Sequence, residues 1–123
     1  MAHVYRPSRL TILNPCVTIS GTIADIRGQA DGDYHVMLRV DQGSTCGGRD
    51  CLDDGDRQLQ QGYLVVEVVC ERQVSQEDAI ATCSQYHNNL AIPPVGSHVF
   101  VTGPWVHDSH GWNEIHPVVR FGR

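Results

Sequence analysis

The chain has 123 residues and a formal charge of −5 at pH 7, which argues against a general electrostatic grip on nucleic acid. Its hydrophobic content of 41% and charged content of 19% are typical of a globular protein and exclude general disorder. The length suits one domain, and no run approaches the roughly 18 apolar residues that span a bilayer.

The first predicted element is a long strand over residues 16–27, CVTISGTIADIR, which follows an extended lead-in over residues 1–15. The lead-in is closed by Asn14-Pro15. Gly21 lies in the middle of the strand, where we expect a bulge or a sharp bend.

A second strand, YHVMLRV, follows a DGD turn, and its apolar and polar residues alternate cleanly. The alternation predicts that Tyr34, Val36 and Leu38 are buried. It predicts that the opposite face, which carries His35, is polar and accessible. A register error of one residue would invert every one of these assignments.

The remaining elements follow residues 42–61, a polar, turn-rich segment that we predict to be a loop. The apolar run GYLVVEVVCE is typical of a strand buried on both faces, apart from Glu67. Ser75 is an N-cap candidate for a helix with acidic residues in its first turn. The predicted order is a strand over 62–71, a helix over 75–86, and strands over 97–106 and 112–121.

This order, β-β-β-α-β-β with a long kinked first strand, resembles the OB-fold, a five-stranded Greek-key barrel. The segments HGWNEIHPVVRF, DGDYH and NPCVTISG also resemble a group of small, uncharacterised bacterial proteins. The resemblance implies an all-β protein with one short helix, in which residues 16–123 form a single OB-fold domain. OB-folds host nucleic-acid binders, sugar binders and calcium-dependent nucleases, so the fold alone leaves the activity open.

Five cysteines are many for so short a chain. Cys46 and Cys51 flank a Gly-rich loop that closes easily, and the predicted helix brings Cys83 back toward Cys70. We therefore predict the disulfides Cys46–Cys51 and Cys70–Cys83, an unpaired Cys16, and a secreted or periplasmic protein. Export would require that a leader was removed, because MAHVYRPSRL lacks a signal-peptide core. The alternatives are buried reduced thiols in the cytoplasm or a zinc site, whose spacing fits poorly.

A polar cluster follows from the two-residue period of strands that neighbour one another in an OB-fold. If Ile115, Val119 and Phe121 face the core, the side chains between them face outward. Asp108 and His110 can reach the same surface from the loop before the last strand. The predicted patch on the outer barrel face consists of Asp33, His35, Glu67, Glu114 and His116.

Carboxylates beside imidazoles suit a divalent cation, here Mg²⁺, Mn²⁺ or Ca²⁺. The predicted metal ligands are Asp33, Glu67, Glu114 and His116. Glu67 is the most telling of them, because a carboxylate within LVVEVVC is costly unless it is exposed or has a partner. The structural alternative is a set of cross-strand His–Glu pairs, each contributing ~0.2–1 kcal/mol to sheet stability.

The leading hypothesis is a metal-dependent phosphodiesterase, a monomeric nuclease of low sequence preference acting on DNA or RNA without membrane association. The ion would orient the phosphodiester and activate water. His116 or His35 would act as general base beside Glu67, with His110 as helper. Arg39, on the same strand face, is the candidate for stabilising transition-state charge.

Two other functions fit the sequence. One is a non-catalytic OB-fold module that binds single-stranded nucleic acid, an oligosaccharide or a protein, although the acidic face disfavours nucleic acid. The other is a stress or envelope protein whose histidines and carboxylates capture metal. Weaker candidates are Trp105 and Trp112, which suit stacking or core packing equally, and CLDDGDR, half a calcium loop that we predict to be solvated.

Overall fold

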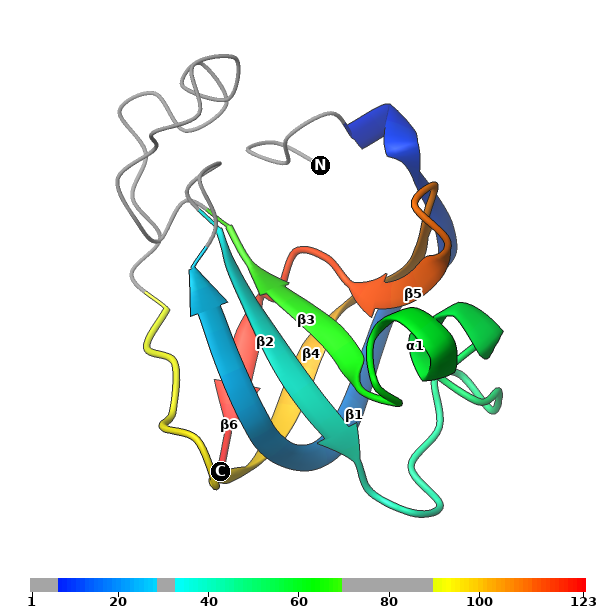
Figure 1. The fold of residues 1–123 in the computed structure, drawn as a ribbon. Helices are drawn as coiled ribbons and strands as arrows, with labels where there is room; N and C mark the ends of the chain where they lie inside the picture. The colour runs from blue at the N-terminus through cyan, green and yellow to red at the C-terminus, as the bar shows by residue number, and fades with distance from the viewer. Residues whose placement is uncertain (1–6, 29–32, 70–89) are drawn as a thin grey trace.

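A mostly β structure surrounds one apolar core in the computed structural model, which describes residues 7–28, 33–69 and 90–123 (Figure 1). Five strands pair into a ring, and a sixth short strand extends it. The elements are η1 (Pro7–Arg9), β1 (Leu10–Gly28), β2 (Tyr34–Val40), α1 (Asp54–Leu59), β3 (Leu64–Val68), β4 (His98–Asp108), β5 (Trp112–Ile115) and β6 (Arg120–Gly122).

The ring closes because β1 pairs with β2 on one side and with β4 on the other. The order around it is β1-β2-β3-β5-β4 and back to β1, with β6 added to β4. β3 and β5 run parallel, and the other pairings are antiparallel. In the view of Figure 1, β2 and β3 lie in front of β4 and β6, so the ring has two opposite walls.

The core fills the inside of this ring with alternate side chains from each strand. Val36 and Leu38 of β2 are fully buried there, as the sequence predicts, and Tyr34 packs against the core while half-buried. Burial of one such aliphatic side chain stabilises the fold by about 1.5–3 kcal/mol. Ile115 is also in the core, so the inward face of β5 is predicted correctly.

β1 is longer than predicted, since it begins at Leu10 and includes part of the expected lead-in. Gly21 pairs with both β2 and β4, and a Cβ atom there would lie 2.4 Å from the carbonyl oxygen of Arg39. The glycine therefore permits a close approach of neighbouring strands. The irregularity in pairing with β2 lies further on, between Ile23 and Asp25.

The segment 42–61 is more ordered than the predicted loop. It contains α1, which Asp53 caps in a reciprocal capping box with Asp56. It also contains the predicted disulfide Cys46–Cys51, with a Cα–Cα distance of 5.1 Å and both cysteines buried. The turn-rich composition concealed a six-residue helix because its polar caps have the same residue types as a loop.

The last predicted strand, 112–121, is wrong as one element. β5 ends at Ile115 and β6 begins at Arg120, because Pro117 between them has no amide hydrogen for a ladder bond. The interruption shifts the alternation, so that Val118 is buried and Val119 is 61% exposed. The prediction that Val119 faces the core is therefore also wrong. Phe121 does pack against the core, as predicted.

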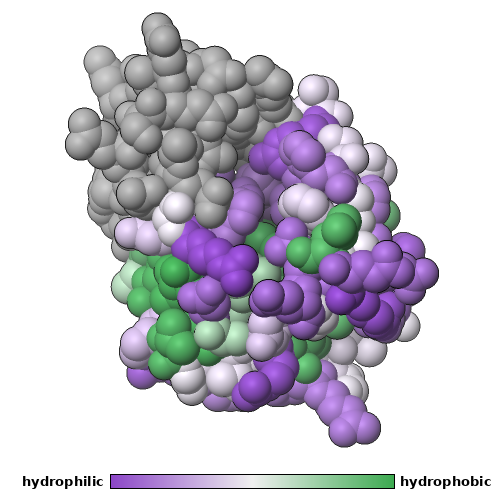
Figure 2. Space-filling view, viewed as in Figure 1, coloured by the Kyte–Doolittle hydropathy of each residue, from purple (hydrophilic) through white to green (hydrophobic). Residues whose placement is uncertain are grey.

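Two predictions lie outside the described residues: the helix over 75–86 and the disulfide Cys70–Cys83. Cys16 is exposed and in no disulfide within the described ranges, in line with its predicted unpaired state. Among these ranges no helix has the length and apolar character needed to cross a membrane. Figure 2 shows hydrophilic side chains over α1 and a hydrophobic area at the opposite edge, beside the segment leading into β4.

Candidate metal centre

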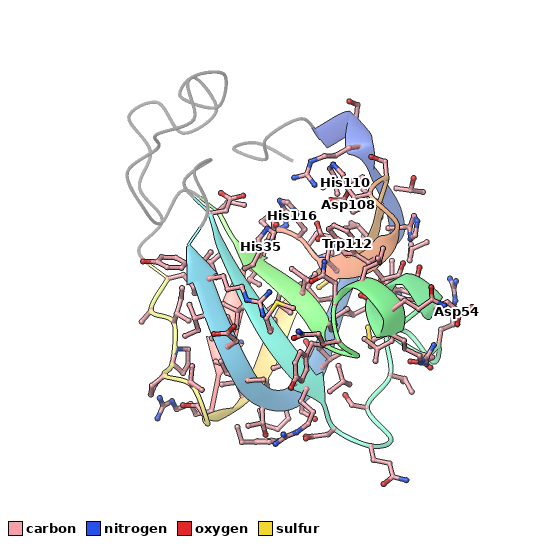
Figure 3. All side chains as sticks on the ribbon, viewed as in Figure 1. His35, Asp54, Asp108, His110, Trp112 and His116 are labelled. Atoms are coloured by element: carbon pink, nitrogen blue, oxygen red, sulfur yellow. A yellow bond between two sulfur atoms is a disulfide. The ribbon has the colours of Figure 1, made fainter. Side chains whose placement is uncertain are left out.

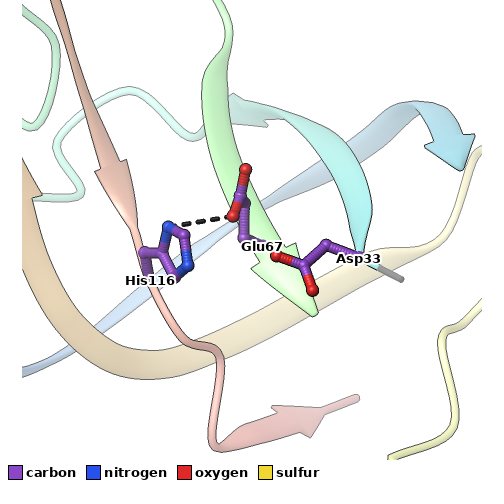
Figure 4. Close-up of side chains that lie close together, drawn as sticks. All are labelled: Asp33, Glu67 and His116. Carbon is purple, nitrogen blue, oxygen red and sulfur yellow. Dashed lines mark ion pairs between the residues drawn. The ribbon is translucent and has the colours of Figure 1, made fainter. Parts of the chain in front are cut away.

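Three potential metal ligands converge where β2 begins, β3 ends and β5 has just ended. They are Asp33 before β2, Glu67 in β3 and His116 after β5. One donor atom from each lies within 4.8 Å of the others, and Figure 4 shows the side chains pointing toward one another. They meet because β3 pairs with both β2 and β5.

Glu67 lies on the face of β3 opposite the core, as the two-residue period predicts. It is directly across the ladder from His35, and the Nε2 of His35 forms an ion pair with its carboxylate. Its second oxygen, Oε2, lies 2.9 Å from Nδ1 of His116. The carboxylate is therefore held between two imidazoles.

His116 is fully buried and is the centre of the cluster. Its Nδ1 lies 2.6 Å from Oε1 of Glu114, a hydrogen bond that fixes the ring. Its Nε2 is also buried, and within the described part of the chain this nitrogen has no hydrogen-bond partner. A buried polar atom without a partner is uncommon and costs about 1–3 kcal/mol, so it calls for an explanation.

Electrostatics favour a charged Glu67–His116 pair. Burial alone would raise the pKa of Glu67, but the nearby charges of His116 and His35 lower it below its usual range. Burial opposes the charge of His116, yet the two glutamates raise its pKa to about 10. Burial, together with repulsion from Glu67, raises the pKa of Glu114. The cluster therefore retains a proton on His116 that another cation could replace.

The side chain of His35 is 24% exposed, but the predicted accessibility is wrong for the other four residues of this patch. Asp33, Glu67, Glu114 and His116 are at most 2% exposed. The face of β2 that carries His35 is not polar throughout either, since Met37 on that face is buried. Periodicity assigned Glu67 to the correct face of the sheet, but it could not tell whether that face is covered.

A second group of polar side chains continues from Glu114 toward the turn between β4 and β5 (Figure 3). The indole Nε1 of Trp112 donates to Glu114, and its ring stacks on His110 with centroids 5.7 Å apart. Nδ1 of His110 lies 2.6 Å from the buried carboxylate of Asp108, which also pairs with Arg9. His110 is thus connected to Glu114 indirectly, through the ring of Trp112.

The candidate arginine is placed away from this centre. Arg39 lies at the far end of β2, beyond Leu38, the last residue there that pairs with β3. It is four positions along the strand from His35, about 13 Å at the usual rise per residue. Among the described arginines, Arg9 approaches the cluster and lies 4.0 Å from Glu114. No local pattern pointed to Arg9, because it lies in the expected lead-in.

A further buried acid, Asp56, was not predicted from the sequence. Asp56 in α1 accepts hydrogen bonds from the backbone amides of Asp53 and Asn113, at 2.9 and 3.1 Å. Its burial, with a smaller contribution from the neighbouring Asp53, raises its pKa to about 8. The capping-box spacing could have identified Asp56 as a helix residue, but its contact with β5 is tertiary.

The donor set at the first centre fits a divalent metal ion. Two carboxylates and one imidazole nitrogen are ligands that Mn²⁺ and Zn²⁺ accept. Glu114 holds Nδ1 of His116, the arrangement by which carboxylates orient histidine ligands in metal sites. The remaining nitrogen, Nε2, is then the donor that an ion would satisfy.

Comparisons with known proteins make no assignment for this chain. No protein-family model matches it, and neither does any curated protein or any solved structure. Its function is therefore inferred from the residues and geometry of the site.

Proposed function

We propose that this protein binds a divalent metal ion through Asp33, Glu67 and His116 and hydrolyses phosphodiester bonds in DNA or RNA. The carrying observation is Nε2 of His116, a buried nitrogen with no partner in the described residues. Ligation of a metal would remove the cost of that unsatisfied atom. Of the three ions expected from the sequence, Mn²⁺ best accepts both carboxylate and imidazole ligands.

The chain supplies groups for orientation and proton transfer around this centre. A bound ion would offset the carboxylate charge, orient a phosphate group and lower the pKa of water. Glu114 keeps Nε2 of His116 directed at the ligand position. His110 is the favoured general base, because Asp108 engages its Nδ1 while 65% of its side chain is exposed.

The ring of strands supports an OB-fold assignment. An OB-fold is a five-stranded Greek-key barrel, and the order β1-β2-β3-β5-β4 with return to β1 is compatible with it. The disulfide Cys46–Cys51 is compatible with a secreted or periplasmic location. We include both in the proposal: an exported, monomeric OB-fold nuclease.

The second candidate function is non-catalytic, with the same ion acting as part of a binding module. The observation that favours it is the burial of all three ligands, which are at most 2% exposed. Catalytic metal sites keep a coordination position open to substrate, whereas structural sites are closed. The two candidates predict the same metal affinity and differ in whether cleavage accompanies it.

The deciding experiment measures metal binding and cleavage on the same samples. Protein stripped with EDTA receives Mn²⁺, Mg²⁺, Ca²⁺ or Zn²⁺, and its melting temperature and its cleavage of single- and double-stranded DNA and RNA are recorded. We expect Mn²⁺ to raise the melting temperature, because a ligand that binds the folded state stabilises it. We also expect metal-dependent cleavage.

The variants Glu67→Gln and Asp33→Asn should lose the metal-induced shift. Glu114→Gln should weaken metal affinity about 10–100-fold, the usual effect of removing a residue that orients a ligand. Asp41→Asn is the matched control, because Asp41 also pairs with a histidine, His98 at 2.6 Å, but on an exposed surface. A wild-type protein that no metal stabilises would exclude the metal centre, and stabilisation without cleavage would select the non-catalytic candidate.

A further inference from the structure

A groove lies on the outer surface of β1, β4 and β6. Figure 1 shows β4 and β6 behind β2 and β3. It has a volume of about 360 Å³. We call it the β1–β4–β6 groove and define it by its lining residues, which are Thr18, Phe100, Thr102, Arg120, Gly122 and Arg123. It shares no residue with the metal centre.

One cross-strand row of side chains in the groove has donors and a positive charge that suit an anion. The register places Thr18 opposite Thr102, and Thr102 opposite Arg120, so three polar side chains cross the three strands side by side. The two threonine hydroxyls lie 2.8 Å apart on the surface. One hydroxyl donates to the other, and the second hydroxyl hydrogen, beside an exposed guanidinium, is left to donate to the oxygens of a phosphate group.

The neighbouring row leaves an aromatic ring uncovered. Phe100 is 47% exposed and lies directly opposite Gly122, which has no side chain to pack over it. A Cβ atom at Gly122 would approach the Cβ of Phe100 to 3.7 Å, so any larger residue there would fill this space. His98 borders the ring on one side, perpendicular to it at 5.7 Å.

The two rows are two residues apart along β4, or about 6.7 Å at the usual rise of a strand. This spacing is similar to that between the phosphate and the base of a nucleotide. The charge of the groove agrees, because its lining includes Arg120 and Arg123 and no acidic residue, although the chain as a whole carries −5. Three of the other described arginines are paired with carboxylates: Arg9, Arg27 and Arg57.

We propose that the β1–β4–β6 groove binds a nucleoside phosphate, with the phosphate on Thr18, Thr102 and Arg120 and the base stacked on Phe100. The ligand is a free nucleotide or the terminal nucleotide of a single strand, which present the same chemistry. This site requires no metal and is independent of the proposed hydrolysis.

The test is an NMR titration of the protein in EDTA with AMP, adenosine, ribose 5-phosphate and a short single-stranded oligonucleotide. We expect AMP to produce saturable shifts at the amides of Phe100, Thr102 and Arg120. Adenosine and ribose 5-phosphate should each bind more weakly, because one lacks the phosphate and the other the base. A stronger response to the oligonucleotide than to AMP would identify a strand end as the ligand.

Three variants test the contacts without disturbing the core. Arg120→Gln should weaken AMP binding about tenfold or more, since a hydrogen bond to a charged group contributes about 1.5–3 kcal/mol. Phe100→Ala should weaken it by a similar factor through lost stacking, and Gly122→Val should block the groove. Arg27→Gln, which removes an equal charge elsewhere, should have no effect.

Two results would overturn the proposal. One is the absence of saturable shifts with AMP at concentrations up to about 10 mM, the weakest affinity worth assigning to a site. The other is equal weakening by Arg27→Gln and Arg120→Gln, because binding would then report net charge and not the groove. Both can be obtained with metal-free protein, so neither depends on the outcome at Glu67.

Discussion

Two buried carboxyl groups of this protein have pKa shifts of opposite sign. Glu67 lies between two histidines, and although burial opposes its charge, they lower its pKa below the usual range. Asp56 lies in α1, where burial, reinforced by the neighbouring Asp53, raises the pKa to about 8 despite two backbone amide donors. Burial therefore does not decide whether a carboxyl group is charged; its partners do.

The same difference separates a candidate functional site from a structural one. Glu67 is charged and belongs to a cluster in which a nitrogen of His116 has no partner among the described residues. Asp56 is a neutral acid at pH values below its pKa, and its hydrogen bonds connect α1 to β5. Both acids are equally buried, so the surrounding donors distinguish their roles.

The largest effect on stability is expected from Glu67→Gln in metal-free protein. Removing one partner of a buried ion pair leaves the other charge uncompensated and typically costs about 3–5 kcal/mol. Urea unfolding in EDTA measures this loss. The exposed pair of Asp25 and Arg27, at 2.8 Å, supplies the control, because solvent screens an exposed ion pair and Asp25→Asn should cost much less stability than Glu67→Gln. Equal losses in the two variants would contradict the description of Glu67 as a buried, charged group.

The next largest effect concerns the contact that holds α1 in place. A Cβ atom at Gly55 would lie 1.6 Å from the carbonyl oxygen of Gly111, so the helix or the β4–β5 turn would have to move. We expect Gly55→Ala to cost about 3 kcal/mol, at the upper end of the range for overpacking. Gly122→Ala is the control, because its Cβ has only ordinary contacts at 3.7 Å. Unfolding curves that coincide for the two variants would show that α1 does not pack as described.

Loss of the disulfide Cys46–Cys51 should lower the free energy of unfolding by about 2 kcal/mol and leave the metal centre unaffected. Cys46 and Cys51 close a short loop, for which the entropy of the unfolded chain predicts about that stabilisation. The carbonyl oxygen of Cys51 accepts from the indole of Trp105 at 3.1 Å, so this loop supports the α1 side of the core. We expect the double Cys→Ala variant to be less stable and to bind Mn²⁺ as wild type does. A matching loss of metal affinity would mean that the two regions are coupled.

The smallest effect is a pH dependence that belongs to Asp56. Between about pH 5 and pH 6 the folded state keeps this proton and the unfolded state has released it, so stability falls as pH rises. The slope is at most about 1.4 kcal/mol per pH unit. In the same window Glu67 is ionised in both states, and the contribution of His116, whose pKa is raised to about 10, is constant below about pH 6.5.

Asp56→Asn should make this dependence shallower, because the amide stays neutral at every pH. Glu114, whose pKa is also raised, contributes a slope of the same sign that this variant leaves unchanged. Asp54→Asn on the same helix is the control, since the side chain of Asp54 is 92% exposed. Chemical denaturation at several pH values between 5 and 6 provides the comparison. A slope as steep in Asp56→Asn as in wild type would assign the titration to other groups and remove the contrast with Glu67.

Local patterns were sufficient for several parts of the fold. The clean alternation of YHVMLRV placed β2 at residues 34–40 and Val36 and Leu38 in the core, because a strand has a side-chain period of two. The short Gly-rich segment between Cys46 and Cys51 was enough to predict their disulfide, since closure of so short a loop depends on local geometry. Pro117 is a local signal for a break within residues 112–121. The prediction of one continuous strand over that range ignored this signal, and it therefore placed Val119 on the wrong face.

By residue type and strand period, the sequence alone selected residues that the structure brings into one cluster: Asp33, His35, Glu67, Glu114 and His116. It could not determine that they are buried, nor that Nδ1 of His116 is held by Glu114 while Nε2 has no partner in the described residues. Those properties depend on what covers the outer face of a sheet and on which strands become neighbours. The parallel pairing of β3 with β5 joins residues about fifty positions apart, and no local pattern encodes such a contact.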